Sequence, residues 1–302
     1  MNAPPPFLEV KNLSKSFGAV QALRNISFSV ERGEVFGYLG PNGAGKTTTL
    51  RAIIGMVYAD DGESLLSGKR VTTIDREGIG YLPGELHLYG NMTAAALIDH
   101  FARYRPQCPP VLREELLKAL GLKPEDLTRK IKFLSHGTKQ KIGLIVAMQH
   151  DPALLLLDEP TLGLDPLVQH AFLEIVRDVA KRGRSVLFSS HILSEVEAVC
   201  SRVAILRAGE IVTMESIDEL RLKMVRRLFV RFRHTPPLNL EAVPGVARIE
   251  GSDTEAVIWI KGDVNPILRR LAEADIERFV FPEPELEDIF LSYYRAEFPS
   301  HG

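Results

Sequence analysis

The sequence predicts an α/β fold that is followed by a second, smaller α/β domain. From about residue 7 to residue 218, short apolar runs alternate with stretches of helical periodicity, which is typical of alternating strands and helices. A glycine-rich loop lies between an apolar run at 35–39 and a helical pattern, as at the phosphate sites of many α/β proteins. Beyond about residue 220 the composition changes, so we place the second domain at residues 219–302.

The elements of the first domain are expected in a definite order. Strands are predicted at 7–10, 26–30 and 35–39, and a helix follows from residue 47 to about 56. Between about 85 and 150 the period is helical, because Thr93 can cap one helix and Leu112, Leu116 and Leu120 mark the apolar side of another. The apolar run at 153–157 predicts a buried strand. A helix around 166–181, a strand at 185–189, a helix after His191 and strands at 202–206 and 211–214 complete the pattern.

The second domain is predicted from a different pattern. Residues 221–234 contain six Lys or Arg and no acid, and the end of this run alternates apolar with basic residues, which indicates a strand with one wet face. We treat this run as a solvated strand face, with attraction to lipid headgroups or nucleic acid as the alternative. Two further strands at 246–250 and 257–260 suggest a hairpin, and a helix begins near Pro266. Four apolar residues would line one side of a last helix: Leu286, Ile289, Phe290 and Tyr293.

The composition excludes several classes of protein. Among 302 residues, 37 Lys or Arg face 39 Asp or Glu, a formal net charge of −2 that argues against wholesale binding of a polyanion. The longest apolar runs have five residues, far short of a membrane-spanning helix, and the N-terminus carries no signal-peptide pattern. Cys108 and Cys200 indicate neither a disulfide framework nor a zinc site. We therefore expect a cytoplasmic protein.

The strongest motif is the loop Gly40-Pro41-Asn42-Gly43-Ala44-Gly45-Lys46-Thr47, which matches the phosphate-binding pattern G-x-x-x-x-G-K-[ST]. Its glycines let backbone N–H groups approach phosphate oxygens, Lys46 can reach the β- and γ-phosphates, and the Thr47 hydroxyl can ligate Mg²⁺. A chance glycine-rich turn is the alternative. The apolar strand before the loop and the helix after it argue against that alternative.

Two acids follow the apolar run at 153–157. Asp158 stands at the end of a predicted buried strand, and its carboxylate can hold the water shell of a metal ion. The carboxylate of Glu159 can polarise an attacking water. Taken alone, this pattern also fits a strand that meets a solvated turn. Together with the phosphate loop it predicts a nucleotide site with a metal.

Further motifs follow in a specific order. The run Leu134-Ser135-His136-Gly137 precedes Asp158, TLGLDP contains Asp165, SSHILSE contains His191, and LSKSFG contains Phe17. With these motifs the chain, over residues 7–218, resembles the ATP-binding-cassette ATPases that power membrane transporters. The resemblance implies a P-loop NTPase cassette with an antiparallel β subdomain and a helical subdomain at about 85–150, which binds ATP and Mg²⁺.

The resemblance also implies a role for each motif. Ser135 and Gly137 would contact the γ-phosphate of ATP held by a second subunit, His191 would sense the γ-phosphate, and Phe17 would stack on adenine. In isolation, Ser135 would be a helix cap, His191 a strand-end histidine and Phe17 a core residue. The predicted nucleotide contacts are Phe17, Gly40, Pro41, Asn42, Gly43, Ala44, Gly45, Lys46, Thr47, Thr48, Ser135, Gly137 and Asp165. The predicted metal ligands are Thr47 and Asp158, and the predicted catalytic residues are Lys46, Glu159 and His191.

Three positions depart from the family pattern. Position 136 is His instead of Gly, position 138 is Thr instead of Gln, and Gly84 stands where a metal-contacting Gln is usual. The last departure leaves one contact to Mg²⁺ unassigned. We hypothesise that Glu85 or a water takes that place.

The expected function is the ATP-hydrolysing subunit of a membrane exporter. The run from Pro284 to Tyr294 resembles the tails of cassettes that serve drug, antibiotic and polysaccharide exporters. The chain would form a dimer of cassettes, most simply a homodimer. It would dock on separate transmembrane permease subunits through residues 85–133, at the inner face of the cell membrane, without direct contact to nucleic acid. The alternatives are an ATP sensor with weak hydrolysis and a cassette protein that acts on nucleic acid or ribosomes.

Overall fold

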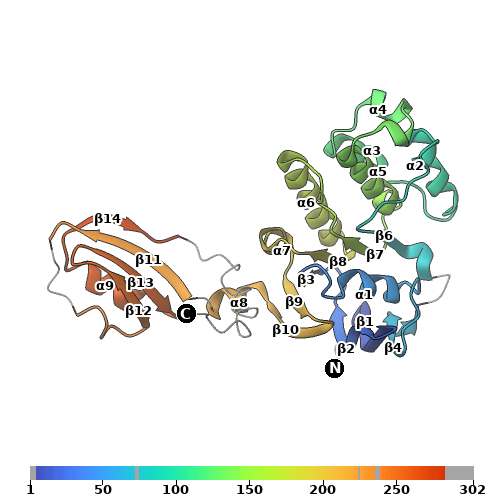
Figure 1. Ribbon diagram of the computed structural model, residues 1–302. Coiled ribbons are helices and arrows are strands. Elements are labelled where there is room, and N and C mark those ends of the chain that lie inside the picture. The colour runs from blue at the N-terminus through green and yellow to red at the C-terminus, as the bar shows by residue number, and fades with distance from the viewer. Residues whose placement is uncertain (1–4, 72–74, 224, 235–238, 283–302) are drawn as a thin grey trace. The chain divides into compact units, whose positions relative to one another are not determined.

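The computed structural model describes residues 5–71, 75–223, 225–234 and 239–282, which fall into two compact units (Figure 1). The first unit spans residues 1–215 and the second spans residues 216–302, so the division lies close to the border expected near residue 218. No helix within the described ranges combines the length and the apolar character that crossing a membrane requires.

A six-stranded sheet forms the centre of the first unit, with the strand order β10-β9-β3-β8-β7-β6. Every residue of β3, β7 and β8 is buried, as expected for short apolar runs in the middle of a sheet. Parallel pairing joins β3 to β8 and β9, and β7 to β6 and β8, so the carboxyl ends of these strands meet at one edge. The strands are β3 (Val35–Leu39), β6 (Ile79–Leu82), β7 (Leu154–Asp158), β8 (Ser185–Ser190), β9 (Arg202–Arg207) and β10 (Glu210–Ser216).

A second sheet, which is antiparallel, belongs to the same unit and has the order β2-β1-β4-β5. Its strands are β1 (Leu8–Phe17), β2 (Val20–Val30), β4 (Asp61–Leu66) and β5 (Lys69–Arg70). The first two are longer than the apolar runs predict, because cross-strand pairing with β2 extends β1 through polar and exposed residues. The predicted antiparallel β subdomain is thereby confirmed.

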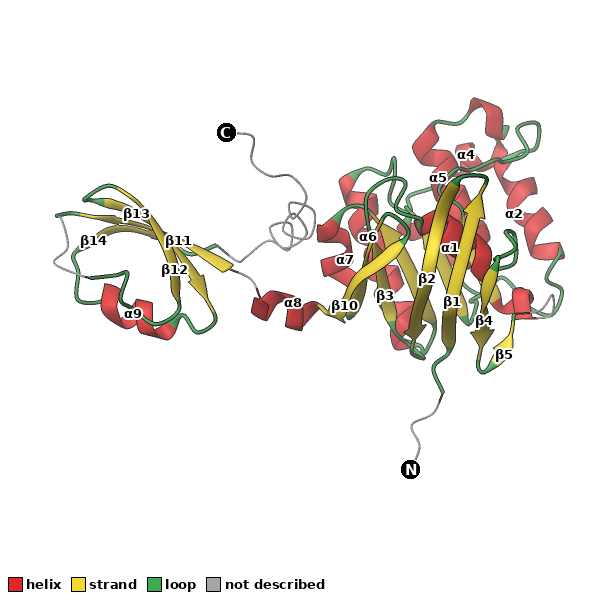
Figure 2. Cartoon of the chain, turned by 60° about the horizontal axis from the view of Figure 1, so that its bottom comes forward, coloured by secondary structure: helices red, strands yellow, loops and turns green. Residues whose placement is uncertain are grey.

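Helix α1 (Lys46–Ile53) shares one core with both sheets (Figure 2). The ring of Phe28 from the antiparallel sheet stacks on Phe36 of β3 with centroids 5.5 Å apart. Tyr38 is fully buried beside them, and its hydroxyl lies 3.0 Å from the Thr49 hydroxyl of α1. Burial raises the pKa of Tyr38, so this hydroxyl stays neutral. The start of α1 is therefore anchored to the central sheet.

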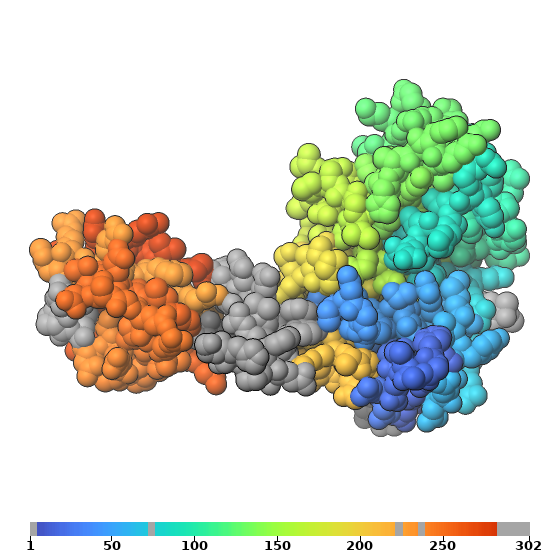
Figure 3. Space-filling model, viewed as in Figure 1, coloured from blue at the N-terminus to red at the C-terminus, as the bar shows by residue number. Residues whose placement is uncertain are grey.

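Four helices between β6 and β7 form the predicted helical subdomain, coloured cyan to green in Figure 3. Thr93 caps the first of them by accepting a hydrogen bond from Ala96 N at 3.2 Å, as predicted. Gln149 is buried at the end of the last helix and donates to the Ile98 carbonyl at 3.1 Å, which ties the subdomain together. The helices are α2 (Ala94–Arg103), α3 (Arg113–Ala119), α4 (Pro124–Thr128) and α5 (His136–Met148), with a short 3₁₀ segment at Ile131–Phe133. Another 3₁₀ segment, Asp75–Gly78, precedes β6.

Two more helices lie against the central sheet, α6 (Pro166–Lys181) and α7 (Leu193–Val199). Asp165 caps α6, because its carboxylate accepts a hydrogen bond from Val168 N at 3.1 Å. The apolar side of α6 buries Phe172, Ile175 and Val176, which is the helical period that the sequence predicts.

In its described residues, the second unit is a small antiparallel sheet with helix α9 packed on one of its faces. The sheet has the order β12-β13-β11-β14, and buried residues from β11, β13 and α9 form its core. The expected last helix lies outside the described residues. The elements are α8 (Ile217–Lys223), β11 (Val225–Phe232), β12 (Val246–Gly251), β13 (Glu255–Lys261), α9 (Asn265–Leu271) and β14 (Ile276–Val280).

Candidate active site

The glycine-rich loop lies between β3 and α1, at the carboxyl edge of the central sheet. Gly45 has a φ of +106°, a conformation that side chains disfavour. A Cβ at Gly45 would also come within 2.7 Å of the Ala22 carbonyl oxygen, and one at Gly40 within 2.7 Å of the Leu206 carbonyl oxygen. Neighbouring backbone therefore restricts both positions to glycine.

The loop borders a hollow of about 600 Å³. On one side the hollow is closed by residues of β2 and of the turns before β2 and β10. Lys46, Thr47 and Thr48, at the start of α1, also line the hollow. The free backbone N–H groups at a helix N-terminus favour an anion. The predicted residues that line the hollow are Pro41, Asn42, Gly43, Gly45, Lys46, Thr47, Thr48 and Glu159.

Lys46 is a buried cation at the edge of this hollow, with only 6% of its surface exposed. Its ammonium donates hydrogen bonds to the carbonyl oxygens of Gly40 at 2.6 Å and Pro41 at 3.2 Å. It also lies 3.1 Å from Glu159 Oε1, within ion-pair distance. A charge removed from water needs such partners, and a phosphate group can supply further oxygen atoms at the same place.

Asp158 ends β7 and is fully buried. Thr47 Oγ1 donates to Asp158 Oδ2 at 2.7 Å, and Ser189 Oγ donates to Asp158 Oδ1 at 2.7 Å. The predicted metal ligands Thr47 and Asp158 thus touch each other. Hydroxyl and carboxylate oxygens are the hard donors that Mg²⁺ prefers, so this pair fits the ion.

The third departure from the family pattern faces the same carboxylate. A Cβ at Gly84 would lie 3.2 Å from Asp158 Oδ2, which puts this residue directly beside the predicted metal ligands Thr47 and Asp158. The Glu85 side chain is 85% exposed, and its carboxylate lies 3.9 Å from His87 Nε2. Glu85 therefore points into solvent, and the geometry does not support the hypothesis that it replaces the usual Gln.

Glu159 has an unusual backbone, with a φ of +49°. A residue with a Cβ pays about 1–2 kcal/mol for this left-handed conformation, and such strain concentrates at functional sites. Its N–H donates to the Ser189 carbonyl at 3.1 Å, and its Oε2 lies 2.7 Å from His191 Nδ1. Its Oε1 is buried and, despite the nearby Lys46, has no aligned hydrogen-bond donor among the described residues. This oxygen remains available to accept a hydrogen bond.

Four residues of the other predicted motifs, Ser135, Gly137, Phe17 and Asp165, lie away from the hollow, whereas His191 contacts Glu159. Ser135 caps α5 by accepting a hydrogen bond from Thr138 N at 3.2 Å. Gly137 approaches the loop after β7 so closely that a Cβ there would lie 2.6 Å from the Gly163 carbonyl oxygen. Phe17 is half exposed at the end of β1. None of these residues, nor Asp165, lines the hollow beside the phosphate loop.

Two residues that the sequence did not single out support the site. Ser189 holds Asp158, as described above, and Gln140 donates from Nε2 to the Pro160 carbonyl at 3.0 Å. Gln140 comes from α5, so it links the helical subdomain to the segment that follows Glu159. Both residues are buried and polar. Ser189 interrupts the apolar run of β8, which is a signal in the sequence, whereas Gln140 stands between Lys139 and Lys141 in a polar stretch and gives no such signal.

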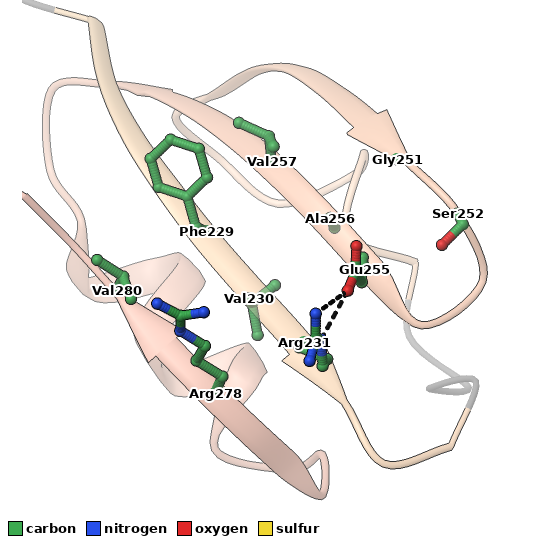
Figure 4. A pocket seen from close by; sticks show the side chains of 10 residues that line it. All are labelled: Phe229, Val230, Arg231, Gly251, Ser252, Glu255, Ala256, Val257, Arg278 and Val280. Atoms are coloured by element: carbon green, nitrogen blue, oxygen red, sulfur yellow. Dashed lines mark hydrogen bonds and ion pairs between the residues drawn. The ribbon is translucent and has the colours of Figure 1, made fainter.

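A second hollow, of about 580 Å³, lies on the second unit (Figure 4). Its wall is the exposed face of β11, β13 and β14, with Phe229, Val257 and Val280 as apolar residues. Arg231 donates from Nε to Glu255 Oε1 at 2.6 Å, so its charge is already balanced. This surface has no helix N-terminus and no glycine-rich loop before a helix. The features that favour a phosphate group therefore occur at the hollow in the first unit.

Comparison with known proteins identifies the family of the chain. The sequence model of the ABC transporter family matches residues 23–162. The ABC transporter ATP-binding protein YtrB of Bacillus subtilis is 33% identical over 84% of this chain and 90% of its own length. The Nod factor export ATP-binding protein I of Paraburkholderia xenovorans is 31% identical over 95% of this chain and 97% of its own length. A solved structure of the ATP-binding subunit of an ABC transporter is 33% identical, with a TM-score of 0.65 over 71% of this chain and 92% of that one.

Fold, phosphate loop and relatives together define an ATP-binding cassette. The chain belongs to the ABC transporter family, among its ATP-binding proteins. It is an ATPase of that family and resembles its exporter-type members.

Proposed function

We propose that this chain is the ATP-hydrolysing subunit of an ABC exporter and that it works as a homodimer on separate membrane-spanning subunits. The observation that carries this proposal is the contact of Lys46 and His191 with the same carboxylate, Glu159, beside the phosphate loop. The export relative, similar over nearly the whole length of both chains, favours the direction of transport. The dimer would sit at the inner face of the cell membrane, docked through residues 85–133.

The residues around the phosphate loop would divide the work of binding. Lys46 would contact the β- and γ-phosphates, and backbone N–H groups of the loop would hold the remaining oxygens. Thr47 and Asp158 would hold Mg²⁺, which when bound supplies positive charge against the phosphate oxygens. Phe17, with its ring half exposed at the end of β1, would stack on the adenine.

Hydrolysis would depend on Glu159 and His191. Glu159 Oε1 would accept a hydrogen bond from the attacking water and orient it toward the γ-phosphate. His191, 2.7 Å from Oε2, would hold that carboxylate and contact the γ-phosphate. Ser135 and Gly137 of the second subunit would donate a hydroxyl and an N–H to the same phosphate, so ATP would close the dimer. Asp165 would contact the opposite subunit.

The experiment is to replace Glu159 by Gln and to measure phosphate release and ATP binding on the full chain. Loss of a general base typically lowers turnover by about 100- to 10,000-fold, and ATP binding should persist. Glu174→Gln is the matched control, because this α6 residue forms only a half-exposed ion pair with Arg177. If Glu159→Gln bound ATP and hydrolysed it at the rate of the control, the assignment of Glu159 would be wrong.

A second function is favoured by one observation. Position 84 lies next to Asp158 and offers no side chain to a metal ion. Such a gap is compatible with a sensor that binds ATP and hydrolyses it only weakly. The wild-type protein distinguishes the two functions, since the sensor would release phosphate no faster than Glu159→Gln.

A further inference from the structure

Besides Asp158 and Glu159, a third carboxylate belongs to Glu195 of α7, four residues after His191. Its side chain is buried, with 7% of the residue exposed. Thr161 Oγ1 donates to Glu195 Oε1 at 2.6 Å, and Ser190 Oγ donates to Glu195 Oε2 at 2.8 Å. Both hydroxyl groups are buried as well. One carboxylate therefore joins the segment that follows β7 to the segment that follows β8.

The first of these segments is the loop 161–165. The Thr161 carbonyl accepts hydrogen bonds from Leu164 N at 3.0 Å and from Gln169 Nε2 at 3.3 Å, so Thr161 organises the loop. Gly163 in the middle of the loop faces Gly137 of α5. A movement of Thr161 would thus displace Gly163, which contacts the start of α5.

The second segment carries His191. Ser190 Oγ donates to Glu195 and accepts a hydrogen bond from Ile192 N at 2.9 Å. These two bonds span the residue between them, His191, whose ring contacts Glu159 at 2.7 Å. The position of the His191 ring therefore depends on a hydroxyl that Glu195 holds.

Burial and neighbouring groups act in opposite directions on the pKa of Glu195, and the net result is a raised pKa. Burial raises the pKa of Glu195, and the bonds from Thr161 and Ser190 oppose that shift. Glu159 nearby raises the pKa further, whereas His191 lowers it. Two hydroxyl donors aimed at the two oxygens match a carboxylate that accepts at both. Since both oxygens are engaged, Glu195 is not arranged to contact reacting atoms.

We propose that Glu195 is a positioning residue for ATP hydrolysis, which ties the loop 161–165 to His191 so that the two move together. The proposal rests on the proposed function, in which Asp165 at the end of this loop contacts the opposite subunit. Glu195 then transmits the closure of the dimer to the pair formed by His191 and Glu159. It sets where His191 lies when Glu159 orients the water.

The sharpest test removes one hydroxyl and leaves the carboxylate in place. Thr161→Val keeps the shape of the side chain but cannot donate to Glu195, and Thr161→Ser keeps the hydroxyl. We expect Thr161→Val to lower kcat by about 10-fold or more, as for loss of a hydrogen bond to a charged group, with ATP affinity nearly unchanged. Thr161→Ser should keep turnover close to that of the wild type. Thr213→Val is the matched control, because it removes a Thr–Glu bond of 2.8 Å on β10, away from the site.

A double-mutant cycle separates positioning from mere structure. If Thr161 acts through His191, Thr161→Val should have little effect in a His191→Ala background, whereas a general loss of stability would lower turnover equally in both backgrounds. Glu195→Gln should behave like Thr161→Val, with a lower kcat and a nearly unchanged ATP affinity. If that variant fails to fold, the Thr161 series still decides.

The outcomes distinguish this inference from the function on which it rests. Wild-type protein without ATP turnover would overturn both. Wild-type turnover that falls in Glu159→Gln but is unchanged in Thr161→Val would overturn the role of Glu195 alone, as would additive effects of Thr161→Val and His191→Ala.

Discussion

Replacing Gly137 by Ala tests whether α5 and the loop 161–165 must touch for hydrolysis. A Cβ at Gly137 would come within 2.6 Å of the Gly163 carbonyl oxygen, whereas ordinary contacts begin at 3.4 Å, so the two backbones would separate by about 0.8 Å. Gly163 has little room to yield. It has a φ of +77°, and the His136 ring already fills the space where its own Cβ would lie, at 2.5 Å.

The expected effect has two parts. Overpacking against backbone costs about 1–3 kcal/mol of stability, and the midpoint of urea unfolding should fall accordingly. A shift of about 1 Å in a positioning element can lower turnover about 100-fold. ATP affinity of the isolated subunit should stay within about two-fold, because Gly137 does not line the hollow at the phosphate loop.

The assay is steady-state phosphate release at saturating ATP and Mg²⁺, with ATP binding measured separately. Gly78→Ala is the control, because a Cβ at Gly78 meets nothing within 4 Å. The reasoning would be refuted if Gly137→Ala kept turnover within about three-fold of wild type, since the close contact would then not matter for hydrolysis.

Two further predictions concern buried basic side chains, the cationic Lys46 and the neutral His150. Lys46→Ala should weaken ATP binding by about 10- to 100-fold, the equivalent of one or two charge-assisted hydrogen bonds, whereas Lys181→Ala, with an exposed side chain on α6, should bind ATP as wild type does. Equal affinities for the two variants would contradict the role of Lys46. Burial lowers the pKa of His150 from 6.5 to about 4. The unfolded chain therefore binds more protons between these values, and the protein should lose about 2 kcal/mol of stability as the pH falls from 7 to 5. Measured by urea unfolding, the stability of His150→Gln should decline less than that of the wild type over this range. Equal declines for the two proteins would contradict the lowered pKa of His150.

Features that depend on neighbours in sequence were predictable. The caps Thr93 and Ser135 bond to N–H groups three residues further on, so their spacing alone reveals them. The phosphate loop is equally local, because its glycines, Lys46 and Thr47 all act within one turn between a strand and a helix. Buried strands such as Val35–Leu39 are visible as continuous apolar runs.

Contacts between distant segments were not predictable in the same way. Ser189 lies 31 residues from Asp158, and nothing in the spacing of the two residues indicates that one donates to the other. The exposed side chain of Glu85 could not be inferred either, because a residue after a strand end can point into the site or away from it. The stacking of Phe17 on adenine and the roles of Ser135, Gly137 and Asp165 toward a second subunit stay predictions.

The sequence by itself determined the alternation of strands and helices, the phosphate loop and the two acids after β7, because these features rest on local backbone geometry and on the period of apolar residues. The cassette followed from the resemblance of its ordered motifs to a known family. Only the tertiary structure decided how the site is held. It brought Lys46 and His191 to opposite oxygens of Glu159, and Thr161 and Ser190 to opposite oxygens of Glu195. The physical reason is that packing of β7, β8 and α7 sets these distances, and packing depends on the shapes of all the neighbours together.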